Sequence, residues 1–276
     1  MNTPRTRLEL VLQDIGFLAV AVSGGVDSMT LASAARLALG PEAMMALHAR
    51  SPAVPAEATR RVRAQAAAEG WALRVIDAGE FADPAYRANP VNRCFYCKTN
   101  LYSAIRQVTD RPIVSGANLS DLGEYRPGLD AAREHGVRHP YIEAGIDKPA
   151  VRALARELGL GAIAELPAAP CLSSRVETGI PIEPETLRFV HTVENLVGAR
   201  LGPGQASRAV RCRVRKTRVV IELDPLSLDA LDEADRSILQ HRITAEAPSS
   251  LAGLPVSFAP YRTGSAFLLQ PAGGSR

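Results

Sequence analysis

The sequence predicts an α/β protein in which a parallel sheet is sandwiched between helices, with a second, smaller α+β domain after it. Apolar runs near the N-terminus alternate with helical patterns in a βαβαβ order, at residues 16–22, 43–48 and 71–76. Parallel neighbours need long connections, so this alternation is typical of a parallel sheet with right-handed crossovers. A chain of 276 residues holds one large domain and one small one. We expect the first over residues 1–180 and the second over 181–276.

Helical spacing in the first domain falls between and after these strands, at residues 5–13, 29–39, 57–69, 99–107 and 149–158. Gly70 is suited to the left-handed position after a helix, and Asp147 to a cap before one. The pattern lapses over residues 79–90, where we expect a loop, and residues 112–115 predict a further short strand.

The second domain is expected to begin with a helix over residues 184–197. Strands at 209–215 and 218–223 follow, then a helix around 227–231 and a late strand at 255–258. The predicted loop at 202–205 and the C-terminal residues 271–276, which we expect to be disordered, lie outside these elements.

Composition excludes several classes of protein. No window approaches the roughly 18 uninterrupted apolar residues of a membrane span, and no export signal is evident at the N-terminus, so we expect a cytoplasmic protein. The net charge of +3 is too weak to imply nucleic acid. Four cysteines are too few for a disulfide scaffold, and are better weighed as ligands, nucleophiles or core residues.

The turn Ser23-Gly24-Gly25-Val26-Asp27-Ser28 joins the first strand to the next helix. Two glycines let the backbone approach an anion, the helix N-terminus offers N–H groups, and Ser23 and Ser28 add hydroxyl donors. Asp27 can hold the Mg²⁺ that accompanies a nucleotide. The turn lacks the Gly-Lys-Ser/Thr ending of a Walker loop and the dinucleotide G-x-G-x-x-G. It predicts a phosphate-binding turn of another kind.

Cys94 and Cys97 form a C-x-x-C pair, whose spacing lets two thiolates reach one metal or cluster. We place the pair in a loop ahead of the 99–107 helix, where it does not open a helix as a thioredoxin motif would. Cys171, close to Arg175, can be a nucleophile, a further cluster ligand or an inert loop thiol. Two small buried residues remain the alternative for the pair.

Strict alternation along residues 210–215 places Cys212 in the core and arginines on the opposite face, at Arg211, Arg213 and Arg215. With Arg208, Lys216 and Arg218 nearby, that face either binds a phosphorylated ligand or RNA or is simply solvated. On spacing alone, Glu194 and Glu222 are surface acids. Metal ligation and pairing with these arginines are the alternatives.

Several of these motifs together resemble a known family. S-G-G-V-D-S resembles the signature of the PP-loop ATP pyrophosphatases, which have an adenine nucleotide alpha hydrolase-like fold. With R-C-F-Y-C-K at 93–98, G-A-N-L-S-D-L-G-E-Y-R-P-G-L at 116–129, P-C-L-S-S-R at 170–175 and V-R-C-R-V-R at 210–215, the chain resembles the LarE family of ATP-dependent sulfur transferases. That family takes part in nickel-pincer nucleotide synthesis.

The resemblance implies an enzyme that uses ATP and Mg²⁺ to adenylate the carboxylates of pyridinium-3,5-biscarboxylic acid mononucleotide and replaces oxygen with sulfur. One subgroup sacrifices the sulfur of a single cysteine, which Cys171 matches. In the other, three cysteines hold a [4Fe-4S] cluster that carries sulfide, and Cys94, Cys97 and Cys171 match that triad. The chain therefore resembles the cluster-dependent type, which needs a sulfide donor, and a homo-oligomer, a ring of six, is expected.

By the same resemblance, Ser23, Gly24, Gly25, Asp27 and Ser28 would bind pyrophosphate and Mg²⁺. Nucleotide or substrate contacts are expected from Lys98, Asp121 and Arg126. Phosphate contacts are expected from Ser174, Arg175, Arg211 and Arg213, and Glu222 matches a metal-associated acid at a subunit interface.

Other functions remain open on the sequence alone. A transfer-RNA thiolation enzyme also joins such a loop to cysteines, but it calls for a broad basic surface. A non-catalytic nucleotide-binding module with structural zinc would be favoured by a degenerate loop, whereas Asp27 and both glycines are intact. An amide-forming synthetase would have no need of the cysteines.

Overall fold

The computed structural model describes residues 3–123, 125–168, 170–202 and 209–266. The chain forms two compact units, unit 1 being Met1–Glu80 with Cys94–Ala169, and unit 2 being Phe81–Arg93 with Pro170–Arg276. The division thus falls before Pro170 rather than after residue 180. The segment 81–93, which includes most of the loop predicted at 79–90 in the first domain, belongs to unit 2. Residues 203–205 of the predicted loop, Arg208 and residues 271–276 lie outside the described residues.

Unit 1 is built on a four-stranded sheet in the order β3-β2-β1-β4, in which all neighbouring strands are parallel. The strands are β1 (Leu18–Ala21), β2 (Met44–Ala49), β3 (Ala72–Ile76) and β4 (Ile113–Val114). The helices are α1 (Pro4–Ile15), α2 (Val26–Leu39), α3 (Ala56–Glu69), α5 (Arg93–Val108), α6 (Pro127–Glu134), α7 (Pro140–Glu143) and α8 (Lys148–Glu157). The parallel α/β prediction is confirmed for this unit.

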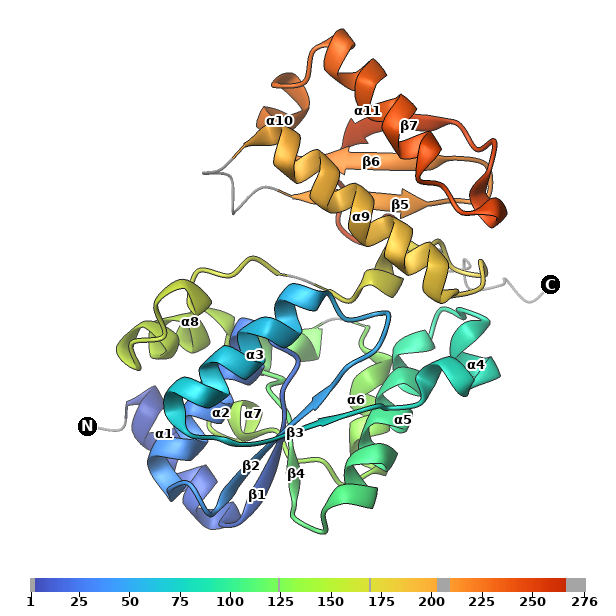
Figure 1. Ribbon diagram of the computed structural model, residues 1–276. Helices are drawn as coiled ribbons and strands as arrows, with labels where there is room; N and C mark the ends of the chain where they lie inside the picture. The colour runs from blue at the N-terminus through green and yellow to red at the C-terminus, as the bar shows by residue number, and fades with distance from the viewer. Residues whose placement is uncertain (1–2, 124, 169, 203–208, 267–276) are drawn as a thin grey trace, which may run out of the picture. The chain divides into compact units, whose positions relative to one another are not determined.

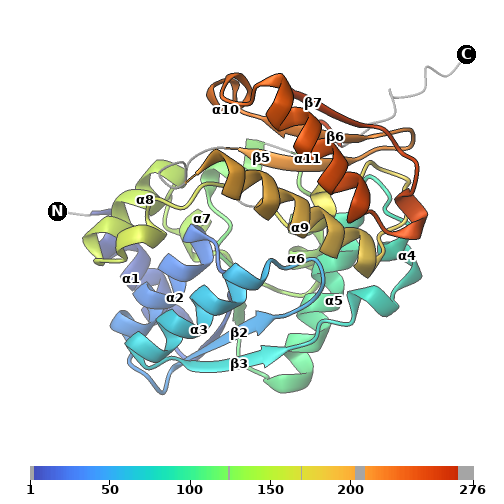
Figure 2. The ribbon, with the colours of Figure 1, turned by 45° about the horizontal axis from the view of Figure 1, so that its top comes forward.

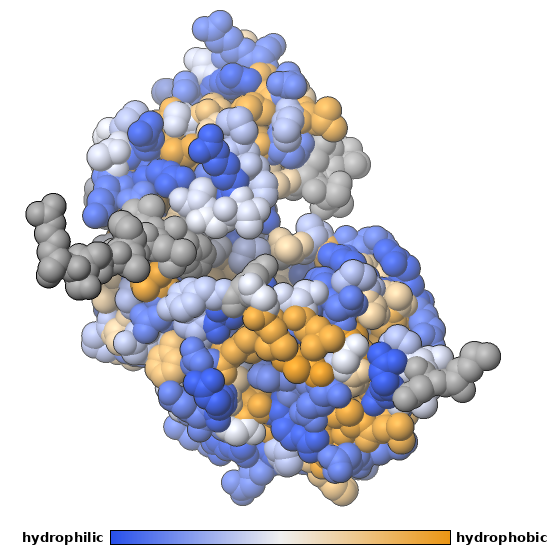
Figure 3. Space-filling view, turned by 180° about the vertical axis from the view of Figure 1, so that it is seen from behind, coloured by the Kyte–Doolittle hydropathy of each residue, from blue (hydrophilic) through white to orange (hydrophobic). Residues whose placement is uncertain are grey.

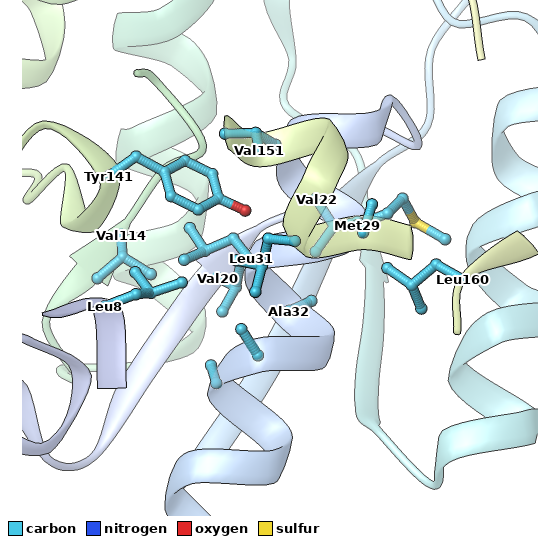
Figure 4. Close-up of a cluster of buried hydrophobic side chains, with 14 of the residues drawn as sticks. Leu8, Val20, Val22, Met29, Leu31, Ala32, Val114, Tyr141, Val151 and Leu160 are labelled. Atoms are coloured by element: carbon cyan, nitrogen blue, oxygen red, sulfur yellow. The ribbon is translucent and has the colours of Figure 1, made fainter. Parts of the chain in front are cut away.

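Both faces of this sheet are covered, because β1 alternates between two apolar cores. Leu18, Val20 and Val22 join the core formed with α1, α2, α3, α7 and α8. Figure 4 shows part of this core, in which Val20 and Leu31 lie between Tyr141 on one side and Met29 and Leu160 on the other. Ala19 and Ala21 join the second core, formed with α5 and α6, which lie on the other side of the sheet (Figure 2). Burial on both faces explains the continuous apolar character of the strand.

Local signals set several element ends as predicted. The Asp147 carboxylate accepts a hydrogen bond from the Ala150 amide at 3.0 Å and caps α8. Gly70 follows α3 with φ at 68°, a left-handed conformation that favours glycine. By contrast, α2 begins after Gly25 with no side-chain hydrogen bond at its cap, so the amide groups of its first turn are left without one.

Helices α5 and α11 differ from the prediction, and the shorter helices α4 (Pro84–Arg87), α6 and α7 were not predicted either. Helix α5 begins at Arg93, so Cys94 and Cys97 lie in its first turns rather than in a loop ahead of it. Helix α11 (Glu233–Ala245) was missed. The apolar residues that it buries are Leu239 and Ile243. A polar helix that buries so little gives a weak periodic signal. Its cap, where Asp232 accepts from the Asp235 amide at 2.7 Å, was the stronger clue.

Unit 2 contains a three-stranded sheet in the order β5-β6-β7. The antiparallel hairpin of β5 (Val210–Val214) and β6 (Val219–Leu223) is followed by β7 (Val256–Pro260), which runs parallel to β6. Helices α9 (Pro184–Leu201) and α11 cross one face of this sheet (Figure 1). The remaining helices are α4 (Pro84–Arg87) and α10 (Pro225–Asp229), and short 3-10 turns include Leu172–Arg175.

The segment 81–93 is fixed within unit 2 by buried polar groups. The Asn89 amide donates to the carbonyls of Glu177 and Ile180, both at 2.9 Å. The Tyr86 hydroxyl lies 2.7 Å from that of Ser173.

Among the described helices, none has the length and apolar character needed to cross a membrane.

Candidate functional site

The strand order of unit 1 creates a switch point between β1 and β4. From β1 the chain adds β2 and then β3 on one side, and returns to place β4 on the other side of β1. Open parallel sheets bind ligands at the carboxyl ends of the strands that flank such a point. The segments there are Ser23–Ser28 after β1 and residues 115–123 after β4.

The turn after β1 is held by its own serines. The Ser28 hydroxyl accepts from the Ser23 amide at 3.0 Å and lies 3.1 Å from the Ser23 hydroxyl. Gly24 has φ at 86°, and a Cβ there would lie 2.9 Å from the Ala58 carbonyl oxygen, so only glycine fits without strain. No side chain caps α2, so the amide groups of its first turn have no side-chain acceptor. Such a helix start is a favourable site for an anion, and the turn fits a phosphate.

Asp27, in the first turn of α2, is the centre of a polar cluster. The Lys148 ammonium lies 2.5 Å from its Oδ2, and the Asn118 amide donates to its Oδ1 at 3.4 Å. The Tyr141 hydroxyl donates to its backbone carbonyl at 3.0 Å. The Asp27 and Lys148 side chains are 28% and 31% exposed, so an incoming ligand can reach both. A carboxylate in this position fits a magnesium ligand.

Lys148 was missed by the sequence reasoning. It is the first residue of α8, directly after the capping residue Asp147, and its amide donates to the Ser120 hydroxyl at 3.2 Å. A lysine at a helix start normally reads as a solvated side chain. The available signal in the sequence was its position directly after Asp147, the predicted capping residue.

The segment after β4 lies directly on the start of α2. A Cβ at Gly116 would lie 2.9 Å from the Asp27 carbonyl carbon and from the Ser28 nitrogen. The Asp121 carboxylate accepts a hydrogen bond from the backbone N–H of Asn118 at 3.0 Å and pairs with the Arg126 guanidinium at 2.9 Å. The predicted nucleotide contacts Asp121 and Arg126 therefore belong to the same part of unit 1 as Asp27.

The C-x-x-C pair is tied to this segment. Cys94 and Cys97 are half-buried and three residues apart on α5, a spacing that brings side chains to one face of a helix. A Cβ at Gly128 would lie 3.1 Å from the Lys98 Cγ and 3.7 Å from the Cys94 carbonyl oxygen. The start of α6 therefore packs against the turn that carries both the pair and Lys98.

Two histidines support these strand ends. His48 is buried, with Nδ1 2.8 Å from the Val22 carbonyl oxygen and Nε2 2.9 Å from the Thr59 hydroxyl. A carbonyl only accepts, so Nδ1 carries the proton and Nε2 accepts from Thr59. Burial lowers the pKa of His48 and also that of His139, whose Nδ1 lies 2.9 Å from the Ser115 hydroxyl. Neither was predicted from sequence.

The candidate residues of unit 2 are bound up in ion pairs. The Arg175 guanidinium donates to both carboxylate oxygens of Glu194, at 2.9 and 3.1 Å, and to the Ser174 hydroxyl at 3.0 Å. Its Nη1 also donates to the Cys171 carbonyl at 3.1 Å. Arg175 is 4% exposed and Glu194 14%. Glu194 is thus an arginine partner, and its assignment as a surface acid is wrong.

Glu222 is likewise buried and paired. Its Oε2 accepts from Arg213 at 2.9 Å, and the two side chains are 3% and 5% exposed. Its Oε1 accepts from Arg215 at 3.3 Å and from the Ser265 hydroxyl at 2.7 Å. The surface assignment is wrong here too. Arg213 faces away from Cys212 as alternation predicts, yet it is not solvated, because this carboxylate compensates its charge.

Cys212 and Arg211 complete strand β5. Cys212 is fully buried as predicted, and burial raises the pKa of its thiol. Arg211 is half-buried, with its guanidinium 5.8 Å from the centre of the Tyr261 ring. Burial, and then the neighbouring Arg175, lower the pKa of Arg211. These positive side chains lie close together in unit 2.

The cysteines are divided between the units. Cys94 and Cys97 belong to unit 1, and Cys171 to unit 2. Within the described part of either unit, no three His, Cys, Asp or Glu side chains are grouped to hold a metal. The three cysteines expected to bind a cluster therefore do not all belong to one unit. The C-x-x-C pair by itself fits two of those ligands.

Comparison with known proteins places the chain among relatives. An uncharacterized protein of Synechocystis sp. is 38% identical over 227 residues, which cover 80% of this chain and 82% of the relative. The chain belongs to the family of this protein. An uncharacterized protein of Methanocaldococcus jannaschii is 25% identical over 211 residues, 75% of this chain and 77% of the relative. No protein-family model matches the chain.

One relative has a named activity. The pyridinium-3,5-bisthiocarboxylic acid mononucleotide synthase of Lactiplantibacillus plantarum is 30% identical over 164 residues. The match covers 58% of this chain and 59% of the synthase. The family therefore has a relative whose name describes a synthase of a thiocarboxylated nucleotide.

Proposed function

We propose that the protein is an ATP-dependent sulfurtransferase with a PP-loop fold. It adenylates carboxylates of pyridinium-3,5-biscarboxylic acid mononucleotide and converts them to thiocarboxylates for nickel-pincer nucleotide synthesis. The observation that carries the proposal is the cluster around Asp27, beside an uncapped helix start and tied through the segment 116–128 to the C-x-x-C pair. The named activity of the Lactiplantibacillus relative supports the choice of substrate.

The Ser23–Ser28 turn and Asp27 account for the use of ATP. The amide groups at the start of α2 would bind phosphate oxygens, with hydroxyl donors from Ser23 and Ser28. Asp27 would hold Mg²⁺, which would offset charge on the phosphates. Lys148, now paired with Asp27, would turn to the phosphates once the metal takes the carboxylate.

The reaction would then proceed in two steps, adenylation and sulfur transfer. A substrate carboxylate oxygen attacks the α-phosphorus of ATP, which forms an acyl-adenylate and releases pyrophosphate. A sulfide anion attacks the acyl carbon and displaces AMP, which leaves a thiocarboxylate. Adenylation is needed because an oxygen dianion is a poor leaving group, whereas AMP is a good one. Lys98, Asp121 and Arg126 would orient the nucleotide or the substrate.

The thiols account for the sulfur. Cys94, Cys97 and Cys171 would hold a [4Fe-4S] cluster, which would carry the sulfide that is transferred. A sulfide donor must reload it after each turnover. The small-molecule substrate would be bound in a cytoplasmic homo-oligomer, a ring of six by resemblance.

The adenylation claim is tested with Asp27→Asn. We expect AMP formation from ATP, Mg²⁺ and the dicarboxylate to fall by about 10²- to 10³-fold. Asp130→Asn is the matched control, because Asp130 is exposed on α6 and pairs only with Arg133 at the surface. Unchanged AMP formation by Asp27→Asn would remove the claim. Stimulation by transfer RNA instead of the dicarboxylate would point to RNA thiolation.

The cluster claim is tested by anaerobic purification, with iron and acid-labile sulfide measured on wild type and Cys94→Ala. Iron should be lost from Cys94→Ala and kept by Cys212→Ala, which removes a buried thiol of the core. A colourless, iron-free wild type that still thiolates its substrate, while Cys171 loses the mass of its sulfur, would sink the cluster hypothesis in favour of a sacrificial cysteine.

A further inference from the structure

Unit 2 contains a hollow at the hairpin end of its sheet. It has a volume of about 610 Å³ and is walled by the β5–β6 turn, by strands β6 and β7, and by residues after β7. That volume is in the range of small-molecule sites. The face of unit 2 opposite α9 and α11 presents mainly hydrophilic side chains (Figure 3). All residues that line the hollow belong to unit 2.

The acids that line the hollow are already compensated. Glu222 accepts from Arg213, Arg215 and Ser265, as described above, and Glu177 pairs with Arg215 at 3.4 Å. Arg215 also donates to the Ser265 carbonyl at 3.0 Å. The two arginines and two glutamates of this network therefore carry no net charge together.

The remaining cations of the hollow have no such partner. Lys216, Arg218 and Arg262 line it and are exposed. Among the described residues, none of the three side chains forms a hydrogen bond or an ion pair that would offset its charge. The hollow thus gathers positive charge that the protein itself does not neutralise, and such a concave patch attracts anions.

The wall between these cations is apolar. Val220, Ala259 and Pro260 supply it, beside the backbone of the antiparallel and parallel strand pairs. A surface built only to track a polyanion needs a long basic groove rather than a local hollow with an apolar wall. A dianionic phosphate on a small organic body satisfies both the charge and the wall.

We propose that this hollow binds the phosphate group of a small phosphomonoester, held by Lys216, Arg218 and Arg262 while Val220, Ala259 and Pro260 contact its carbon skeleton. The site shares no residue with the Ser23–Ser28 turn, since every residue in it belongs to unit 2. Arg175 and Arg213, which pair with Glu194 and Glu222, do not line the hollow.

The test measures ribose 5-phosphate binding to the full chain by calorimetry, for wild type and the double variant Lys216→Ala/Arg218→Ala. We expect the affinity to fall by about tenfold or more, because charge-assisted hydrogen bonds to phosphate are lost. Arg188→Ala/Arg242→Ala is the matched control. It removes the same charge from exposed positions that do not line the hollow, and should bind as wild type does.

Three outcomes would overturn the proposal. Equal weakening by the control would mean diffuse surface charge. Loss of binding in Lys148→Ala but not in the double variant would assign the phosphate to unit 1. Binding of RNA with no measurable binding of ribose 5-phosphate would make the patch a nucleic-acid surface. Lys216→Arg/Arg218→Lys keeps the charge and should retain binding, which separates lost charge from lost folding.

Discussion

The two units use ion pairs in opposite ways. In unit 1, Asp27 and Lys148 are each more than a quarter exposed, and Asp27 has two side-chain partners. In unit 2, Glu222 and Arg213 are almost fully buried, and Glu222 has three. An exposed pair exchanges its partner for a ligand at low cost, whereas a buried and saturated pair does not. Charge alone therefore does not mark a binding residue; its accessibility does.

The largest effect is expected in unit 2, where Glu222→Ala leaves Arg213 and Arg215 without their shared carboxylate. Breaking such a buried pair typically costs about 3–5 kcal/mol, because a buried charge is left uncompensated. The free energy of unfolding from urea titration measures it. Glu183→Ala, which removes a surface pair with Arg87, is the control and should cost less than about 1 kcal/mol. A loss as small as this in Glu222→Ala would erase the contrast between the units.

Lys148→Ala makes the equivalent change in unit 1. We expect unfolding to change by less than about 1 kcal/mol, because the pair is partly exposed. AMP formation should fall by about tenfold or more, since a cation near the phosphates is lost. Lys148→Arg tests whether charge alone suffices. If Lys148→Ala unfolds much more easily and its remaining folded fraction is fully active, the pair is structural.

Two glycines of the turn sharpen the comparison within unit 1. Gly24→Ala should destabilise the fold by about 1–3 kcal/mol, because φ is left-handed and the new Cβ would meet the Ala58 carbonyl. Gly25→Ala is the matched control: its backbone is extended, and the nearest side-chain atom, the Ser23 hydroxyl, would lie 3.6 Å away. Equal midpoints in thermal unfolding for the two variants would contradict this account of the turn.

The smallest effect is a pH dependence of unit 1. Burial lowers the pKa of His48 below its ordinary value of 6.5, so the unfolded chain takes up a proton at a pH where the folded chain does not. The contribution of His48 to the free energy of unfolding is therefore fully present above that pH and is lost as the pH falls. For one histidine the loss is at most about 1.4 kcal/mol per pH unit. Urea midpoints between about pH 7.5 and 5.5 measure the slope. His48→Gln should lower the slope, and an unchanged slope would exclude His48 as its source.

The sheet of unit 1 was predictable because β1 and β4 are wholly apolar, and because α2 and α3, which connect the first three strands, each end at a glycine, Gly40 and Gly70. The turn at Ser23–Ser28 was predictable because the residues that form it are contiguous in the sequence. Helix α5 was predicted too short: Cys94, Phe95, Tyr96 and Cys97 have modest helix propensity, and tertiary packing decides their conformation.

The pairing of charges was not predictable. Lys148 is 121 residues from Asp27 in sequence, and nothing local to either residue indicates the other. Glu194 and Glu222 look like surface acids because burial of a carboxylate depends on which arginine the fold brings to it. The hollow of unit 2 shows the same limit, since its basic residues were visible in sequence while the neutrality of their acidic neighbours was not.

The order of segments along the chain has a consequence for how the protein is made. Residues 81–93 leave the ribosome well before residues 173–180, whose hydroxyl and carbonyl groups Tyr86 and Asn89 bind. During synthesis this short piece of unit 2 must wait, unpaired, while the rest of unit 1 emerges. No single cut separates the units, because truncation before Pro170 leaves Tyr86 and Asn89 attached to unit 1 without their partners. The cysteine pair begins at the residue where the chain returns from that borrowed segment.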